Sequence, residues 1–109
     1  MADPQTDILA KLCETIAARV GADPASSYTA KLLAGAPLLP AKKLGEEAVE
    51  TALAAMTGDA QAICAEAADL LYHLLVLLQA SNVSLADVCT ELARREGISG
   101  IAEKNSRAD

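Results

Sequence analysis

The segment LLYHLLVLL, residues 70–78, constrains the fold more than any other part of the chain. It forms the second half of an expected helix over residues 60–80, and it is apolar on every side of that helix. A helix that is apolar all round has to be buried all round. A small helical chain covers only part of that surface. We therefore expect a second copy of the chain to cover the rest, in a homodimer with twofold symmetry.

The amino-acid composition favours helices throughout the chain. Its 109 residues include 24 Ala and 16 Leu, whereas Trp and Phe are absent and Tyr occurs twice. Such a chain is rich in good helix formers and has few of the residues that fill sheets. A chain of this length corresponds to one domain. We predict an all-α bundle of four to five helices in a single domain over residues 1–109.

Proline, glycine and capping residues divide the chain into four long helices and one short helix. Asp59 is the expected N-cap of the helix that carries the apolar segment. Ser84 is the expected N-cap of the last helix, with Asp87 in the capping-box position. The expected helix ranges are about 4–20, 27–34, 41–57, 60–80 and 85–96.

Charge and segment lengths exclude several classes of protein. The net charge of −6 argues against nonspecific binding to nucleic acid or to an anionic membrane. The apolar run over 70–78 is far shorter than the ~20 residues of a membrane span, and the N-terminus MADPQTDILAKL shows no secretory signal. The three cysteines are widely spaced and imply neither a disulfide framework nor a zinc site. We expect a cytoplasmic protein with no nucleic-acid or membrane partner.

Two acidic pairs lie on expected helices that are otherwise apolar. Glu47 and Glu50 are three residues apart, and so are Glu66 and Asp69. Side chains at this spacing share one face of a helix. The turn at residues 58–59 begins eight residues after Glu50 and ends seven before Glu66, and helices with a short connection usually pack antiparallel. We therefore expect the two pairs to face each other across the helix pair.

These carboxylates have no cation near them in the sequence, because no Lys or Arg occurs from Leu44 to Ala93. Two carboxylates about 4 Å apart repel by about 4 kcal/mol at an effective dielectric constant of about 20. Either some of them hold a proton or a divalent cation neutralises them. Oxygen ligands of high charge suit Mg²⁺ or Mn²⁺. The alternative is that the acids form the solvated faces of amphipathic helices.

The single histidine, His73, follows Asp69 by four residues. A di-iron carboxylate bundle needs Glu-x-x-His on two helices, so the sequence does not indicate that kind of metal site. Two roles remain open for His73. It either orients a ligand or a water, or it is a satisfied side chain in a helix interface.

Basic residues bracket the acidic helix pair in the sequence. Lys or Arg beside a bound metal is what a polyphosphate substrate needs, although each of these residues can also be an ordinary solubilising charge. The chain has no Walker loop and no GxGxxG motif, so metal and side chains would have to hold the phosphates. The bracketing residues are Lys31, Lys42, Lys43, Arg94, Arg95, Lys104 and Arg107.

The acidic pattern and several longer segments carry a resemblance. The arrangement Glu47-x-x-Glu50, fifteen residues, Glu66-x-x-Asp69 resembles the metal signature of the MazG-like all-α nucleoside triphosphate pyrophosphatases. The segments SYTAKLL, KKLGEEAVET, EAADLLYHLLVLL and VSLADVCTELARREGISGIAEK are together similar to the phosphoribosyl-ATP pyrophosphohydrolase family. The similarity runs from about Asp7 to Arg107.

The resemblance implies a helical dimer that hydrolyses phosphoribosyl-ATP to phosphoribosyl-AMP and pyrophosphate, the second step of histidine biosynthesis. It implies Mg²⁺ held by Glu47, Glu50, Glu66 and Asp69. Either Glu46 or Glu47 would then act as the base that takes a proton from water. The expected phosphate contacts are Lys31, Lys43, Arg94, Arg95, Ser99 and Lys104.

Two alternatives to this function remain open. A pyrophosphatase that removes noncanonical nucleoside triphosphates would share the metal site and differ in its substrate, although the segment RREGISGIAEK favours phosphoribosyl-ATP. A non-enzymatic helical dimerisation module would need neither the metal nor the carboxylates.

Overall fold

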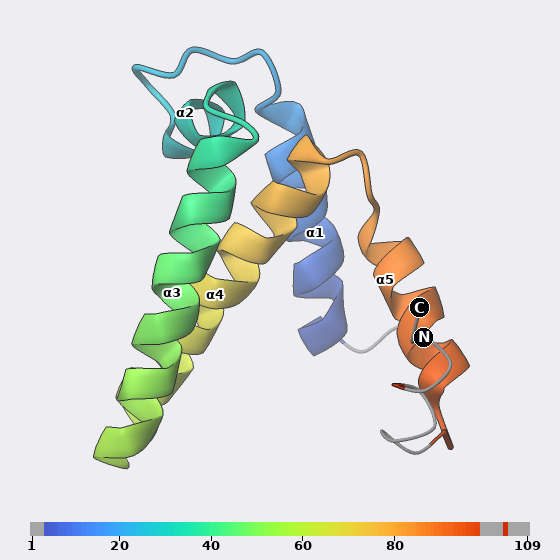
Figure 1. Cartoon of the computed structure of the whole chain (residues 1–109). Coiled ribbons are helices and arrows are strands. Elements are labelled where there is room, and N and C mark those ends of the chain that lie inside the picture. Colours follow the sequence, from blue (N-terminus) through green and yellow to red (C-terminus); the bar gives the residue numbers. More distant parts are fainter. Residues whose placement is uncertain (1–3, 99–103, 105–109) are drawn as a thin grey trace.

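The computed structural model describes residues 4–98 and residue 104. The described residues form five α-helices and no strand (Figure 1). The expected all-α class is therefore confirmed. The helices are α1 (Pro4–Ala18), α2 (Tyr28–Ala34), α3 (Leu38–Thr57), α4 (Ala60–Ala80) and α5 (Leu85–Arg95).

Local capping chemistry sets the helix starts largely as expected. The Asp59 carboxylate accepts hydrogen bonds from two backbone amides in the first turn of α4, and Ser84 forms a capping box with Asp87 at the start of α5. One boundary was wrong, because α3 begins at Leu38 rather than near residue 41. Pro40 lies in the first turn of α3, where backbone amides have no partner within the helix, so its missing N–H costs no hydrogen bond.

Helices α3 and α4 form an antiparallel hairpin and share the most extensive contact between any two helices of the described chain. Gly58 ends α3 in the left-handed conformation with φ +74°, which glycine adopts without strain. Figure 1 shows α4 between α3 and α1, with α2 near the start of α3 and α5 on the side away from α3. The two acidic helices are therefore direct neighbours, whereas α5 is remote from α3.

The hydrophobic core lies where α1, α2 and α4 meet. Its buried residues are Ile16 from α1, Leu32 from α2, and Leu75 and Val76 from α4. Leu85 at the start of α5 packs against this cluster, but no residue of α5 is buried. Helix α2 is thus anchored through Leu32 beside the α3–α4 hairpin.

Part of the α3–α4 hairpin is left uncovered by the described chain. Val49, Leu53 and Met56 on α3 are 58%, 63% and 86% exposed, and Leu71 on α4 is 46% exposed. By length and composition alone α4 could cross a membrane, but the core helix of a soluble protein passes the same test. Within one described chain, the apolar surface of the α3–α4 hairpin is thus incompletely covered.

Candidate functional site

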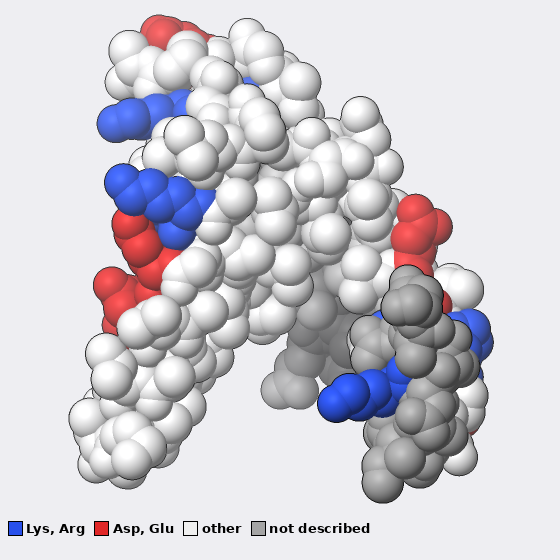
Figure 2. Space-filling view, in the orientation of Figure 1, with Lys and Arg blue, Asp and Glu red and all other residues white. Residues whose placement is uncertain are grey.

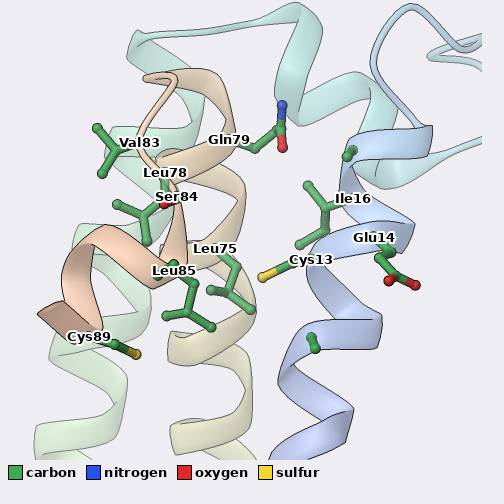
Figure 3. A pocket seen from close by; sticks show the side chains of 13 residues that line it. Cys13, Glu14, Ile16, Leu75, Leu78, Gln79, Val83, Ser84, Leu85 and Cys89 are labelled. Atoms are coloured by element: carbon green, nitrogen blue, oxygen red, sulfur yellow. The ribbon is translucent and has the colours of Figure 1, made fainter.

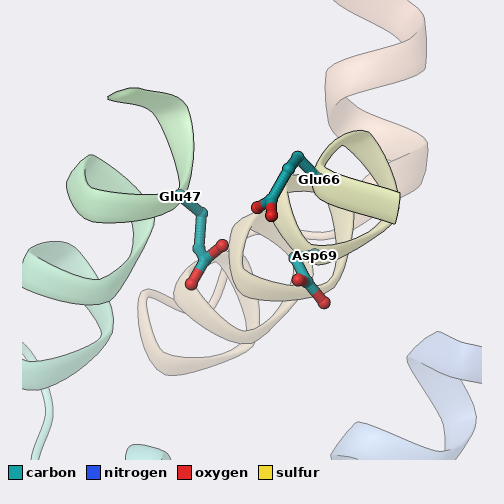
Figure 4. Close-up of side chains that lie close together, drawn as sticks. All are labelled: Glu47, Glu66 and Asp69. Carbon is teal, nitrogen blue, oxygen red and sulfur yellow. The ribbon is translucent and has the colours of Figure 1, made fainter. Parts of the chain in front are cut away.

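Three carboxylates from α3 and α4 meet on the hairpin. Glu47, Glu66 and Asp69 each offer one oxygen, and these oxygens lie within 4.8 Å of one another. Figure 4 shows Glu47 extending from one helix toward Glu66 and Asp69 on the other. The spacing on either side of the 58–59 turn led us to expect that the acidic pairs face each other, and these three side chains do. We call Glu47, Glu66 and Asp69 the carboxylate cluster.

Thr51 joins the two helices at the level of the carboxylate cluster. Its Oγ1 lies 2.7 Å from the carbonyl oxygen of Glu47 and 3.1 Å from that of Glu66. The hydroxyl hydrogen can be donated to either carbonyl, so the residue ties the backbones that carry two of the acids. Thr51 was not among the site residues predicted from the sequence. Its position four residues after Glu47, on the same helix face, was the available signal.

The cluster places carboxylate oxygens where water does not reach them. Glu47 is only 8% exposed, and Oε2 of Glu47 and Oε2 of Glu66 are buried without a hydrogen-bond partner among the described residues. Buried polar atoms in folded proteins are nearly always paired. A proton or a cation would complete these two oxygens.

The same surroundings raise the pKa of both glutamates. Burial is the main cause for Glu47, followed by the neighbouring Glu50 carboxylate. For Glu66, burial is again the main cause, followed by the charges of Glu50 and Asp69. Glu50 is exposed and outside the tightest group, yet its charge acts on both glutamates. The expected fourth ligand therefore borders the carboxylate cluster.

The donor set fits a hard divalent cation. Every candidate ligand is a carboxylate oxygen, the kind of ligand that Mg²⁺ and Mn²⁺ prefer. The residues that could hold such an ion are Glu47, Glu66 and Asp69, with Glu50 beside them.

Glu46 occupies a different environment from Glu47. It is exposed, and its Oε2 lies 3.0 Å from Nζ of Lys43. This ion pair lowers the pKa of Glu46 and raises the pKa of Lys43. Of the two expected bases, Glu47 lies in the carboxylate cluster and Glu46 does not.

His73 is buried next to the cluster and is satisfied at both ring nitrogens. Its Nδ1 lies 2.8 Å from the backbone oxygen of Asp69. A carbonyl only accepts, so Nδ1 carries a hydrogen, and Nε2 is hydrogen-bonded to the hydroxyl of Tyr28 at 3.3 Å. His73 is thus a satisfied side chain in a helix interface, and it also touches the backbone of a cluster residue.

The expected phosphate contacts fall into two separate regions. Lys31 on α2 is exposed, and Lys43 near the start of α3 is paired with Glu46. Figure 2 shows basic and acidic side chains next to one another over α2 and the first half of α3. Arg94 and Arg95 lie on α5, on the side of the molecule away from α3 (Figure 1). Of the remaining two, Lys104 is exposed and Ser99 lies outside the described residues.

The arginines of α5 already have a carboxylate partner. Arg94 contacts Glu91 at 2.6 Å and Arg95 contacts it at 3.2 Å. The Arg94 side chain, and after it Arg95, lowers the pKa of Glu91 to about 2. One chain therefore does not bring these arginines to its own carboxylate cluster.

An apolar groove of about 530 Å³ lies between α1, α4 and the start of α5. Figure 3 shows Cys13, Leu75, Leu85 and Cys89 around it. Glu14 is the one carboxylate among its lining residues, so the groove lacks the charged groups that phosphate chemistry requires. The carboxylate cluster is the better candidate for a catalytic site.

Comparison with known proteins places the chain in a family. The family model described as phosphoribosyl-ATP pyrophosphohydrolase matches residues 9–96. A phosphoribosyl-ATP pyrophosphatase of Dinoroseobacter shibae is 62% identical over 100 residues, which cover 92% of this chain and 98% of the relative. The enzymes of the same name from Caulobacter vibrioides and Paracoccus denitrificans are 59% and 58% identical. The alignments cover 99% and 98% of this chain and 100% and 99% of those relatives. The chain belongs to the phosphoribosyl-ATP pyrophosphohydrolase family.

Proposed function

We propose that this chain is a cytoplasmic hydrolase that converts phosphoribosyl-ATP to phosphoribosyl-AMP and pyrophosphate in histidine biosynthesis. The observation that carries the proposal is the carboxylate cluster, found in a chain of this family. The names of the relatives support the substrate. The two buried, unpaired carboxylate oxygens support the use of a divalent metal.

The metal would be Mg²⁺, with Mn²⁺ as a substitute, held by Glu47, Glu50, Glu66 and Asp69. When bound, it supplies positive charge that polarises a phosphoryl oxygen and stabilises the pyrophosphate leaving group. The four carboxylates would bind the ion. Its positive charge would offset the burial, and after it the neighbouring negative charges, that raise the pKa of Glu47 and Glu66 in the metal-free chain.

Glu47 is the stronger candidate for the general base. A general base has to lie within reach of the water that it activates, and Glu47 lies in the carboxylate cluster whereas Glu46 is exposed and paired with Lys43. The water oxygen forms a bond to phosphorus, its proton goes to a carboxylate oxygen of Glu47, and the anhydride bond between the α- and β-phosphates breaks. Water and phosphoribosyl-ATP thereby give phosphoribosyl-AMP and pyrophosphate.

The phosphate contacts divide between two copies of the chain in this proposal. Lys31 and Lys43 would bind the phosphates of a substrate held at the carboxylate cluster of their own chain, because α2 and α3 lie beside that cluster. Arg94 and Arg95, with Ser99 and Lys104, would act from a second copy in a homodimer. The uncovered apolar residues of the α3–α4 hairpin supply a surface for that second copy.

Substitution of single carboxylates tests the proposal. Asp69→Asn and Glu66→Gln each remove one charged ligand with little change of shape. We expect the rate of pyrophosphate release from phosphoribosyl-ATP to fall at least about 100-fold. Substitution of residues that only orient metal ligands already lowers activity by up to about 100-fold, and these two residues are proposed ligands themselves. Glu14→Gln, on α1 beside the apolar groove, is the matched control and should keep its activity. Full activity of both ligand variants would refute the metal assignment.

A further inference from the structure

Both aromatic residues of the chain lie next to the carboxylate cluster. The chain contains two tyrosines and neither Phe nor Trp. The rings of Tyr28 and Tyr72 stack with their centroids 6.4 Å apart and their planes 21° apart. His73 meets Tyr72 edge to face at 4.9 Å, and it contacts the backbone of Asp69. Tyr72 packs against the hydrophobic core, so Tyr28 is the tyrosine whose surface is free to meet a ligand beside the proposed metal ligands.

Tyr28 is hydrogen-bonded at its hydroxyl and is about half exposed. Its hydroxyl is hydrogen-bonded to Nε2 of His73, which is fixed in turn by the backbone of Asp69. The residue is nevertheless 51% exposed. Packing in the core therefore does not account for the ring. Its position is fixed relative to the carboxylate cluster while much of its surface remains available.

A hollow of about 630 Å³ lies against Tyr28 and is lined by residues of the preceding loop and by Lys31. Lys31 is exposed and forms no ion pair with any described residue. A half-exposed aromatic side chain with a lysine beside it offers stacking for a base and positive charge for phosphate.

We propose that the open surface of Tyr28 stacks against the purine base of a nucleotide whose phosphates extend toward the carboxylate cluster. Aromatic stacking is tolerant of base identity, so Tyr28 would supply affinity and position, while the carboxylates act on the phosphates. The proposal rests on the proposed function for the identity of that nucleotide. The binding of a purine base itself can be measured without turnover.

Two substitutions at one position separate the ring from its hydroxyl. Tyr28→Phe keeps the ring and loses the hydrogen bond to His73, whereas Tyr28→Leu loses both. The probe is AMP in the presence of EDTA, with ribose 5-phosphate as the ligand that lacks a base. Calorimetric titration gives both affinities, and circular dichroism confirms that each variant is folded.

We expect Tyr28→Phe to bind AMP about as well as the unmodified chain, and Tyr28→Leu to bind it about tenfold more weakly. The affinity for ribose 5-phosphate should be the same in all three proteins. Equal AMP affinity in Tyr28→Leu and Tyr28→Phe would overturn the proposal. An equal loss in both variants would also overturn it, because the hydroxyl rather than the ring would then matter. AMP binding that depends on the ring, without turnover of phosphoribosyl-ATP, would keep this inference and refute the proposed function.

Discussion

Replacing Glu47 with Gln should greatly reduce the stabilisation of the protein by metal. The substitution keeps the shape of a side chain that is 8% exposed and removes one of the three charges of the carboxylate cluster. Of the two buried carboxylate oxygens without a partner, only that of Glu66 then remains. The metal-free variant should melt at a higher temperature than the metal-free parent at neutral pH, because its cluster carries less like charge. The metal should then stabilise the variant much less than it stabilises the parent.

The size of the metal effect follows from binding linkage. A ligand at 100 times its dissociation constant stabilises a protein by about 2.7 kcal/mol, which for a domain near this size is a shift of roughly 10 to 20 °C. Loss of a charged ligand should weaken metal binding about 100-fold or more. Substitution of residues that only orient metal ligands already weakens binding by up to about 100-fold. At the same metal concentration the shift then falls to about 2 to 3 °C.

Thermal melting followed by circular dichroism, in EDTA and in Mn²⁺, measures both effects. Glu14→Gln serves as the control because it removes an equivalent carboxylate on α1, and it should show the full shift of the parent protein. If Glu47→Gln also shows the full shift, the carboxylate cluster does not hold the metal through Glu47, and the reasoning from its buried, unpaired oxygen is wrong.

Four further results are expected. The pKa values of Glu47 and Glu66 are raised above 4.5, so the folded chain binds more protons than the unfolded chain between 4.5 and those raised values. These two groups therefore make the metal-free protein less stable as pH rises through that window. Melting from pH 4.5 to 8 should show this loss in EDTA and its reduction with Mg²⁺, and an unchanged loss with Mg²⁺ would contradict the account. Thr51→Val should weaken Mn²⁺ binding about tenfold, whereas Thr51→Ser should retain it. Equal calorimetric affinities in these two variants would show that the hydroxyl bridge has no positioning role. Leu32→Ala, at a core site that is 1% exposed, should lower the free energy of unfolding by about 2 to 5 kcal/mol. Urea unfolding measures this, and a loss below about 1 kcal/mol would contradict the assigned core. Met56→Glu places a charge on the exposed part of the hairpin and should convert a dimer to a monomer in light scattering, and an unchanged mass would place the dimer contact elsewhere.

The parts of the fold that depend on local chemistry could be predicted from the sequence. Asp59 and Ser84 cap the expected helices because a cap needs only a side-chain oxygen and the next few amides. The meeting of Glu47 with Glu66 followed from counting residues on either side of the turn. The start of α3 was misplaced because Pro40 was expected to precede the helix, although the first turn accommodates proline equally well.

The parts that depend on packing between distant segments could not be predicted. Glu46 and Glu47 are adjacent, and the rotation of α3 about its axis decides which of them faces α4. The sequence of α3 does not determine this rotation, because apolar and alanine residues occur on all its sides. The hydrogen bond from Tyr28 to His73 joins residues 45 positions apart. No spacing rule connects them, because α2 reaches α4 only through its packing in the core. The separation of Arg94 from the cluster likewise depends on where α5 lies.

The most direct test of the account is ³¹P NMR of phosphoribosyl-ATP with the purified protein, with Mg²⁺ and with EDTA, beside parallel samples of ATP and dUTP. The account predicts signals of pyrophosphate and phosphoribosyl-AMP only from phosphoribosyl-ATP and only with Mg²⁺. Equal release in EDTA would contradict the role of the carboxylate cluster. Release of pyrophosphate from dUTP or ATP, with phosphoribosyl-ATP unchanged, would contradict the proposed substrate.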